Sequence, residues 1–192
     1  MRDAFQDMKI SLSEGEEKAF RTLFDALFPK LSQFAFSLVK SKDIAKDIVD
    51  EIFIRLWNNR ANIPQIDNIL IYLYKATKNA SLNYLSRSAF RNMHEPFDEI
   101  EIELKDDQDP ESLMITREMS HLIREAIDTL PPRCKMVFKL VREDGLKYKE
   151  VAEVLNISVK TVDAQMVIAV GQIKQKMQIH LNFKSTRILS KK

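Results

Sequence analysis

The chain has 192 residues, of which 30 are Lys or Arg and 28 are Asp or Glu, so its formal net charge is +2. Three Gly and six Pro are too few for a protein of many short strands and turns, and a single Cys excludes an internal disulfide framework. The N-terminal segment lacks the apolar run of a secretory signal, and no apolar stretch approaches the ~20 residues of a membrane helix. We therefore expect a cytoplasmic, all-α protein of two small helical domains, with no direct membrane insertion.

The charges are distributed unevenly along the chain. Residues 1–94 carry a net charge of +3, residues 95–111 carry −8 and residues 112–192 carry +7. Two basic segments joined by an acidic one are typical of a two-domain protein with an anionic partner, although a solvated linker between ordinary domains has the same pattern. We expect a first domain at 1–92, an extended acidic linker at 93–111, a second domain at 112–182 and a basic tail at 183–192.

In the first domain, apolar residues recur at helical spacing over residues 16–91. Pro29 interrupts this pattern, and we expect it either to start a new helix or to kink the first one. Ser41 is suited to cap the next helix, which should end where the polar, proline-containing segment 58–68 begins. A further helix is expected over residues 69–87.

The second domain should contain four helices. The first ends at Pro131, and Pro132 suits the first turn of the second helix, for which Gly145 is the expected C-cap. One apolar face of that helix consists of Cys134, Val137, Phe138 and Val141. The third helix is expected over residues 149–155 and the fourth over residues 159–177.

Residues 148–162 have the pattern of a helix-turn-helix, in which two helices cross steeply over a short turn. Ala152 is the small residue required where the two backbones approach each other. Ser158 can cap the second helix by accepting a hydrogen bond from its first turn. An ordinary αα-hairpin shares this periodicity but does not require the small residue, the short turn and the serine cap together.

The second helix of this motif has an outward side that can approach DNA. At 100° per residue Val162 faces the core, and the outward residues are Lys160, Thr161 and Ala164, with Gln165 at the edge. Further along the helix, Ile168 and Gly171 add no polar groups. We therefore expect sparse base contacts, with phosphate contacts and duplex shape contributing more of the affinity.

The helix over residues 43–57 has an unusual outward side. Its buried face should consist of Ala45, Val49, Ile52 and Leu56. The opposite side carries acids followed by an apolar pair, namely Asp43, Asp47, Asp50, Ile54 and Trp57. A surface that docks a basic partner protein around an aromatic anchor would explain this pattern. Trp57 could equally fold back against the following loop, and the residues alone leave both interpretations open.

The helix over residues 69–87 is basic, because no acid occurs between Asn68 and His94. We expect its inward side to consist of Ile69, Leu73, Ala76, Ala80 and Tyr84, and its outward side of Lys75, Lys78, Asn79, Leu82 and Ser86. The cations are interleaved with Tyr72 and Tyr74, which suits a nucleic-acid strand whose bases stack on rings. Basic solvated helices are common, so this signal is weak by itself.

The sequence contains no arrangement typical of catalysis or metal binding. Cys134 lies on an apolar face and suits a protein core better than a nucleophile's role. His94, His121 and His180 lack metal-ligand spacing, and no phosphate-binding glycine loop is present. We expect no enzyme, no catalytic residue, no substrate, no cofactor and no metal.

These motifs together resemble the extracytoplasmic-function (ECF) group of the bacterial sigma-70 superfamily over nearly the whole chain. Residues 43–57 resemble that group's core-binding helix, and residues 72–87 resemble its promoter-melting helix. Residues 130–133, 145–152 and 158–162 resemble the domain that reads the minus-thirty-five element. The resemblance implies an RNA polymerase sigma factor, which directs core polymerase to specific promoters and assists promoter opening and transcription initiation.

The resemblance also assigns residues to three surfaces. The acidic stripe, implied to bind core polymerase, consists of Asp43, Asp47, Asp50, Glu51, Ile54 and Trp57. The minus-ten set, implied to contact the non-template strand, consists of Asn62, Tyr72, Lys75, Lys78, Asn79 and Arg87. The minus-thirty-five set, implied to contact duplex DNA, consists of Ser158, Lys160, Thr161, Ala164 and Gln165.

The partners implied are core RNA polymerase, promoter DNA and an anti-sigma factor. The last follows from similarity, which includes residues 157–162, to Bacteroidetes members that answer to a membrane anti-sigma factor. Two alternatives are a free-standing helix-turn-helix transcriptional regulator that binds duplex DNA as a dimer, and a helical adaptor that binds only proteins. The acidic stripe and the basic helix favour the sigma factor, since a dimeric repressor needs neither.

Overall fold

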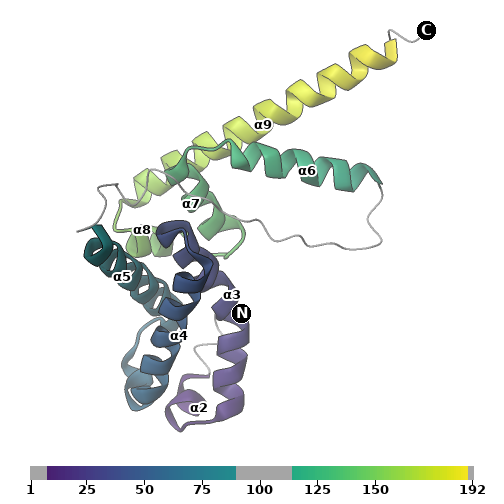
Figure 1. Ribbon diagram of the computed structural model, residues 1–192. Coiled ribbons are helices and arrows are strands. Elements are labelled where there is room, and N and C mark those ends of the chain that lie inside the picture. The colour runs from purple at the N-terminus through teal and green to yellow at the C-terminus, as the bar shows by residue number, and fades with distance from the viewer. Residues whose placement is uncertain (1–7, 90–113, 190–192) are drawn as a thin grey trace.

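The computed structural model describes residues 8–89 and 114–189, and every regular element in these ranges is a helix (Figure 1). The first range contains α2 (Lys9–Ser13), α3 (Glu17–Val39), α4 (Lys42–Asn58), the short 3-10 helix η1 (Arg60–Gln65) and α5 (Ile69–Ala89). The second range contains α6 (Met114–Asp128), α7 (Pro132–Arg142), α8 (Tyr148–Leu155) and α9 (Val159–Leu189). The all-α prediction is confirmed, and the acidic linker expected at 93–111 lies outside the described residues.

Helix α3 is continuous, and the prediction of a new helix at Pro29 is wrong. Leu23, Leu27 and Leu31 are buried on both sides of Pro29, so one apolar stripe continues through it, while the proline itself is exposed. The stripe packs against α4 and α5. This packing stabilises the helix across the one backbone hydrogen bond that proline cannot donate.

Polar side chains cap the two helices that follow. The Ser41 hydroxyl accepts a hydrogen bond from the backbone N–H of Ile44 at 3.5 Å, as predicted. The Asn68 side-chain oxygen accepts from the N–H groups of Leu70 and Ile71 at 3.0 and 3.2 Å, a cap that the sequence analysis does not foresee. These caps fix where α4 and α5 begin, and with it which residues each helix exposes.

The end of α7 agrees only partly with the prediction. Its C-cap is Glu143, two residues before the expected Gly145. Gly145 adopts a φ of 76° in the turn that follows, where the N–H of Leu146 donates to the carbonyl oxygen of Leu140 at 2.9 Å. The glycine therefore ends α7 as a left-handed glycine, next to a bond that reaches six residues back into the helix, as the prediction expects. The C-cap lies two residues earlier, and the glycine begins the turn into α8.

Helices α6, α7 and α9 pack together around a small apolar cluster. Its buried members are Ile127, Leu130, Cys134 and Ala169. Figure 1 shows α6 beside α9, and the Lys176 ammonium of α9 donates to the Glu125 carbonyl oxygen at 2.9 Å. Helix α9 extends to Leu189, past the end expected near residue 177. Neither Gly nor Pro follows Gly171, so the sequence contains no residue that would stop the helix earlier.

The two halves of the described chain share the larger apolar core. Its buried members include Phe34 and Leu73 from the first half, and Met136 and Val151 from the second. Figure 1 shows α8 beside α5, and these helices are in contact. The Ser37 hydroxyl also lies 4.0 Å from the sulfur of Met136. The second half therefore packs directly against the helix that carries most of the minus-ten set.

Candidate functional site

The acidic stripe lies along the exposed side of α4 and borders a groove between α3 and α4. Its acids are exposed, and Ile54 exposes 59% of its surface. The groove is lined by Glu17, Phe20, Arg21, Phe24, Asp50, Phe53, Ile54 and Trp57. Asp50, Ile54 and Trp57 of the stripe therefore meet at this groove, while Asp43 and Asp47 lie on earlier turns of the same helix.

The Trp57 ring is among the side chains that line this groove. It contacts the Phe20 ring edge-on at a centroid distance of 4.8 Å, and the Arg60 guanidinium lies 4.9 Å above it. Phe20 and Phe24 both contact Phe53, so the floor of the groove is aromatic. Trp57 packs against η1 through Arg60, as the fold-back interpretation expects, and it also lines the groove, so the docking interpretation stays a prediction. An aromatic floor with an acidic rim suits a protein partner that presents apolar side chains flanked by Lys or Arg.

Five members of the minus-ten set lie on α5, and they differ in exposure. Tyr72 exposes 44% of its surface, and Asn79 and Arg87 are also exposed. Lys75 and Lys78 are half-buried; burial, and after it the charge of Lys75, lowers the pKa of Lys78. The two ammonium groups therefore lie near each other on one side of α5, where they could meet a phosphate.

Asn62, the remaining member of the set, lies on η1. Its side chain is exposed, and its N–H donates to the carbonyl oxygen of Asn59 at 3.0 Å. Helix η1 packs mainly against α2, from which the Lys9 ammonium donates to the carbonyl oxygens of Ile66 and Asp67. The segment that carries Asn62 is therefore an ordered 3-10 helix that packs against α2.

Tyr74 does not belong to the exposed side of α5. It is fully buried, with its ring 5.3 Å from that of Phe34, so it cannot stack on a base as the sequence pattern suggests. Tyr84, expected to face inward, exposes 37% of its surface, whereas Thr77 and Ser81 are fully buried. The buried side is displaced from the expected one because α5 packs against α3, α4 and α8 at once.

Lys75 also contacts the second half of the chain. Its ammonium lies 2.7 Å from a Glu153 carboxylate oxygen on α8, and the two side chains remain 42% and 51% exposed. At the same junction Lys139 and Asp144 form an ion pair of 3.0 Å, with only 1% and 2% of the side chains exposed. Burial, and after it the Asp144 charge, raises the pKa of the Tyr74 hydroxyl well above its usual range. An exposed ion pair and a buried polar cluster thus lie where α5 meets the second half.

Helices α8 and α9 meet with the geometry of a helix-turn-helix. The chain bends by 109° between α8 and the first part of α9, within the roughly 90–120° of this motif. Asn156 caps α8 in the left-handed conformation, with φ 57° and ψ 49°. The Ser158 hydroxyl accepts from the N–H of Thr161 at 3.0 Å, and Ala152 is buried. The predicted small residue, turn and serine cap are all present.

The minus-thirty-five set is divided between solvent and protein. Ser158, Lys160, Thr161 and Ala164 are exposed. Gln165 is half-buried, and its side-chain oxygen accepts a hydrogen bond from the Cys134 thiol at 2.7 Å. The exposed members are more accessible to a duplex than Gln165, although the Ser158 and Thr161 hydroxyls also contact each other at 2.7 Å.

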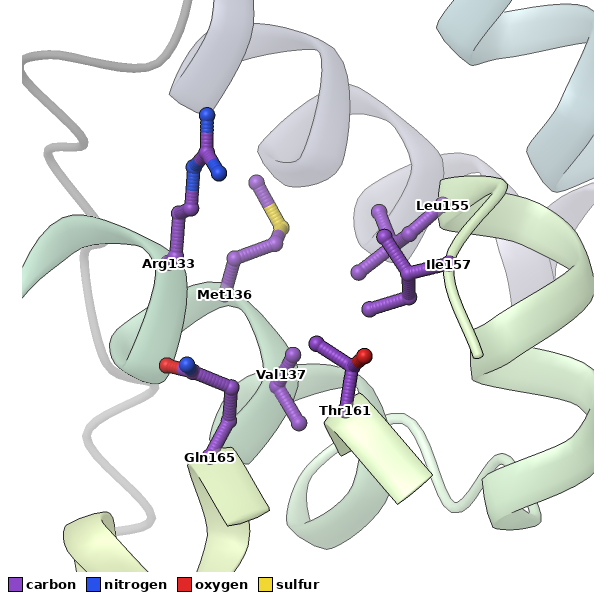
Figure 2. A pocket seen from close by; sticks show the side chains of 7 residues that line it. All are labelled: Arg133, Met136, Val137, Leu155, Ile157, Thr161 and Gln165. Carbon is purple, nitrogen blue, oxygen red and sulfur yellow. The ribbon is translucent and has the colours of Figure 1, made fainter. Parts of the chain in front are cut away.

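The Gln165 side chain lines an apolar pocket. It is lined by Arg133, Met136, Val137, Leu155, Ile157, Thr161 and Gln165. Figure 2 shows Leu155 and Ile157 on one side of this pocket, Met136 and Arg133 on the other, and Thr161 and Gln165 entering from α9. The Gln165 amide is thus directed toward α7, which agrees with its expected place at the edge of the recognition helix.

Three exposed aliphatic residues on α9 lie outside the minus-thirty-five set. Val159, Val167 and Ile168 expose 42%, 66% and 43% of their surfaces. The position of Val167 on the same side of α9 as Lys160 can be read from the sequence, because a separation of seven residues makes about two helical turns. Exposed aliphatic residues are not in themselves indicators of DNA binding, so the pattern gives no reason to select them.

Cys134 is buried, as predicted, and burial raises the pKa of its thiol. An enclosed, neutral thiol is a poor nucleophile. Within residues 8–89 and 114–189, no three His, Cys, Asp or Glu side chains gather as metal ligands. In the same residues no single helix is long and apolar enough to span a membrane, and α8 with the first part of α9 meets that criterion only as a bent pair.

Two family models match the chain. The model described as Sigma-70 region 2 matches residues 23–91, which include α4, η1 and most of α3 and α5. The model described as Sigma-70, region 4 matches residues 120–170, which run from within α6 to the first part of α9. Together they cover more than half of the chain, and each covers one of the expected domains.

Curated relatives match over most of the chain. The ECF RNA polymerase sigma-E factor of Escherichia coli K12 is 29% identical over 174 residues, which cover 87% of this chain and 91% of that protein. The protein of the same name from Haemophilus influenzae is 26% identical, with coverage of 87% and 92%. A solved structure of CnrH in complex with the cytosolic domain of CnrY has a TM-score of 0.54 and 18% identity, covering 92% of this chain and 98% of that one. This last likeness concerns the fold.

Proposed function

Because this chain belongs to the sigma-70 family and contains both its region 2 and its region 4, we propose that it acts in the cytoplasm as an ECF sigma factor. In this role it directs core RNA polymerase to specific promoters and assists promoter opening and transcription initiation. The name shared by the two relatives, and their coverage of 87% of this chain, support the ECF type.

One observation carries this proposal: the chain exposes the groove between α3 and α4 and the helix-turn-helix of α8 and α9 at the same time. The acidic rim and aromatic floor of the groove suit core polymerase, through a basic surface with apolar anchors. Lys160, Thr161 and Ala164 are available to the minus-thirty-five duplex. A free-standing dimeric regulator needs a surface for its second copy but no such acidic groove.

We assign the minus-ten strand to the exposed parts of α5 and η1. Lys75 and Lys78 can meet phosphates, Tyr72 offers a ring for stacking, and Asn62 offers an amide to a flipped base. Unstacking a base costs a few kcal/mol, which contacts to the released strand can offset. Promoter opening would then be driven by binding, without ATP.

The ion pair of Lys75 with Glu153 gives this assignment a consequence for the free protein. A strand that approaches Lys75 must compete with the Glu153 carboxylate, because α8 lies beside α5 (Figure 1). We propose that the two halves separate when the chain binds core polymerase. The free chain should therefore bind promoter DNA weakly and gain specific binding only in the holoenzyme.

The groove is tested by substitutions that leave the core untouched. Asp50→Lys with Ile54→Glu changes only exposed side chains of the groove. Loss of a central anchor in a protein interface costs about 2 kcal/mol or more, so affinity for core polymerase should fall by about 30-fold or more. Pull-down and titration measure this effect. Glu14→Lys makes the same charge change as Asp50→Lys alone, at the exposed C-cap residue that follows α2 and lies outside the groove, and it serves as the control for added positive charge.

Two results would contradict the proposal. Unchanged polymerase binding by the double variant, with helices intact by circular dichroism, would reject the groove as the docking surface. Tight, polymerase-independent binding of duplex DNA would reject the sigma factor and favour the free-standing regulator. Transcription by core polymerase plus the wild-type chain on a promoter library is the direct positive test.

We also propose a regulatory protein partner, an anti-sigma factor. This proposal is supported by the resemblance to ECF factors that are inhibited by such proteins. The test is to purify the tagged chain from its native cell, to identify the proteins that co-purify with it, and to repeat the measurement after each of them is deleted. An unchanged level of free, active chain after every deletion of a co-purifying protein would contradict it.

A further inference from the structure

The outward side of the recognition helix is more apolar than DNA contact usually requires. The exposed residues on the first turns of α9 are Val159, Lys160, Thr161, Asp163, Ala164, Val167 and Ile168. Val167 exposes 66% and Ile168 43%, although isolated aliphatic residues of this size are usually turned toward a core. If region 4 binds duplex DNA as proposed above, these groups are buried in the interface and their chemistry decides what the helix reads.

The helix geometry gathers three of these residues on one side. At 100° per residue, Lys160, Ala164 and Val167 lie within about 60° of one another, and Asp163 lies about 40° beyond Val167. The buried residues Val162, Met166 and Ala169 occupy the opposite side. The side that enters a major groove therefore presents one ammonium, one carboxylate and two aliphatic groups.

The first turns of α9 offer few side chains suited to the commonest direct contacts with purines. Bidentate recognition of guanine requires Arg or Lys, and bidentate recognition of adenine requires Asn or Gln. Between residues 159 and 171, Lys160 is the sole exposed residue of either kind on this side, since Gln165 is directed toward α7; Lys174 and Gln178 follow on the same side beyond Gly171. The one apolar group that a base pair presents in the major groove is the C5-methyl of thymine.

Gly171 supplies a second, independent observation. It lies within about 20° of Lys160 on the same side of α9, two turns beyond Ala164. A Cβ built at Gly171 meets no atom within 4 Å, so packing within the protein does not require glycine there. Glycine inside a helix costs about 1 kcal/mol relative to alanine. A close approach by a partner outside the protein would account for it, and a duplex lying along this side of α9 is such a partner.

We propose that α9 reads the minus-thirty-five element chiefly through thymine methyl groups, which contact Ala164 and Val167, while Gly171 lets the DNA backbone approach closely. Asp163 faces the same groove, where its carboxylate can accept a hydrogen bond from the amino group of cytosine and is repelled by the acceptors of guanine. This inference rests on the proposed function. The sequence alone predicts sparse base contacts, with phosphate contacts and duplex shape contributing more of the affinity. We instead expect a specific preference for thymine beside the Val167 side chain.

The test removes single methyl groups from the DNA. The minus-thirty-five element is first selected from a promoter library with the holoenzyme, and each thymine in it is then replaced by deoxyuridine, which lacks only the C5-methyl. A buried methyl group is worth about 0.8 kcal/mol, so each contacted thymine should cost about three- to four-fold in holoenzyme affinity. Deoxyuridine outside the element should cost nothing and serves as the DNA control.

Protein variants then assign the contact to a residue. The Val167→Ala holoenzyme should be weaker on thymine DNA, and the deoxyuridine substitution that weakens the wild type should no longer affect it. Gln172→Ala, an exposed neighbour about 140° from Val167, should keep the full wild-type response. Gly171→Leu should lower affinity for every promoter while leaving the helices intact by circular dichroism.

The outcomes separate this inference from the proposed function. If the holoenzyme selects a minus-thirty-five element but no thymine in it responds to loss of its methyl, the thymine readout is wrong and the sigma function stands. If Val167→Ala retains the full deoxyuridine response, the contact belongs to another residue and the assignment is overturned. If the chain does not bind core polymerase at all, both proposals fail together.

Discussion

The two surfaces proposed to face DNA differ in how the free chain holds them. The minus-ten side of α5 is engaged with the second half, because Lys75 pairs with Glu153 and Tyr74 is buried at the junction. The recognition side of α9 is exposed from Lys160 to Val167. Both are outward-facing helix sides with lysines, so charge and periodicity do not distinguish them. Packing between distant segments does distinguish them. Helix α8 packs against α5, which carries the minus-ten side, whereas the recognition side of α9 stays exposed.

This difference has a simple geometric cause. Helix α8 packs with one side against α9 and with another against α5. Because α9 leaves α8 at a bend of 109°, it runs away from the first half of the chain (Figure 1). The groove between α3 and α4, which we propose binds polymerase, is open as well. In the free chain, therefore, polymerase and the minus-thirty-five duplex can bind before the minus-ten strand does.

The buried ion pair at the junction offers the largest expected effect. Asp144→Asn removes the nearer charged partner of the Lys139 ammonium, which is 1% exposed, and leaves only the longer contact with Glu143. Breaking a buried pair in this way typically costs about 3–5 kcal/mol of unfolding free energy. Urea unfolding followed by circular dichroism measures it. The control is Glu143→Gln, which alters a longer contact of 3.9 Å with the same lysine and should cost less than about 1 kcal/mol. Equal, small losses for both variants would show that the pair does not support the junction.

The apolar part of the junction should follow in size. Met136 is 1% exposed and belongs to the core that both halves share. Met136→Ala should lower the unfolding free energy by about 2–5 kcal/mol, since it removes buried methylene groups and leaves a cavity. Small-angle scattering should also show a more extended chain. Met177→Ala on α9, outside this shared core, is the matched control and should leave the particle dimensions unchanged.

A smaller effect is expected at the turn that aims α9. Asn156 adopts a positive φ of 57°, which costs alanine about 1 kcal/mol but costs glycine nothing. Asn156→Ala should therefore destabilise the second half by about 1 kcal/mol, and Asn156→Gly should be neutral or slightly stabilising. Thermal unfolding compares the two. A glycine variant that is less stable than the alanine variant would contradict the role given to this conformation.

Most of the features that form the helix-turn-helix and place the recognition helix at the surface can be predicted from the sequence. Ala152, Ser158 and Val162 specify the helix-turn-helix through a small residue, a cap and an apolar contact, all within fifteen residues. Such local rules depend on spacing along one segment, so they can be read without a fold. The acidic stripe follows in the same way, from periodicity on a single helix. The interpretation of Trp57 stayed open because its neighbours Phe20 and Arg60 lie on other elements.

The junction could not be predicted from the sequence, because its contacts join segments far apart in the chain. Lys75 and Glu153 are separated by 78 residues, and nothing local to either indicates the other. Tyr74 follows the alternation of rings and cations on α5, but three packed neighbours turn it inward. Pro29 breaks a local rule and is tolerated because buried leucines on both sides of it continue one stripe. In each case tertiary packing outweighs a local preference.

The smallest expected effect is the coupling between Lys75 and Glu153 itself. Both side chains are about half exposed, so the ion pair should contribute about 0.2–1 kcal/mol in a double-mutant cycle. Lys75→Glu and Glu153→Lys should each weaken packing between the halves, and the combined exchange should restore it. The coupling should decrease toward zero in 1 M salt, where the Debye length is only about 3 Å.

Binding of a single-stranded minus-ten oligonucleotide gives the functional reading of the same pair. Glu153→Lys should increase strand binding by the free chain, because the competitor for Lys75 is gone. Added positive charge by itself also attracts DNA, so Glu125→Lys is the matched control: Glu125 has a similar exposure of 49% but lies on α6, away from α5. Greater enhancement by Glu153→Lys than by Glu125→Lys, at low but not at high salt, is the expected result. Equal enhancement would mean that α8 does not hinder binding of the strand to α5. The contact between α8 and α5 would then have no consequence for DNA binding.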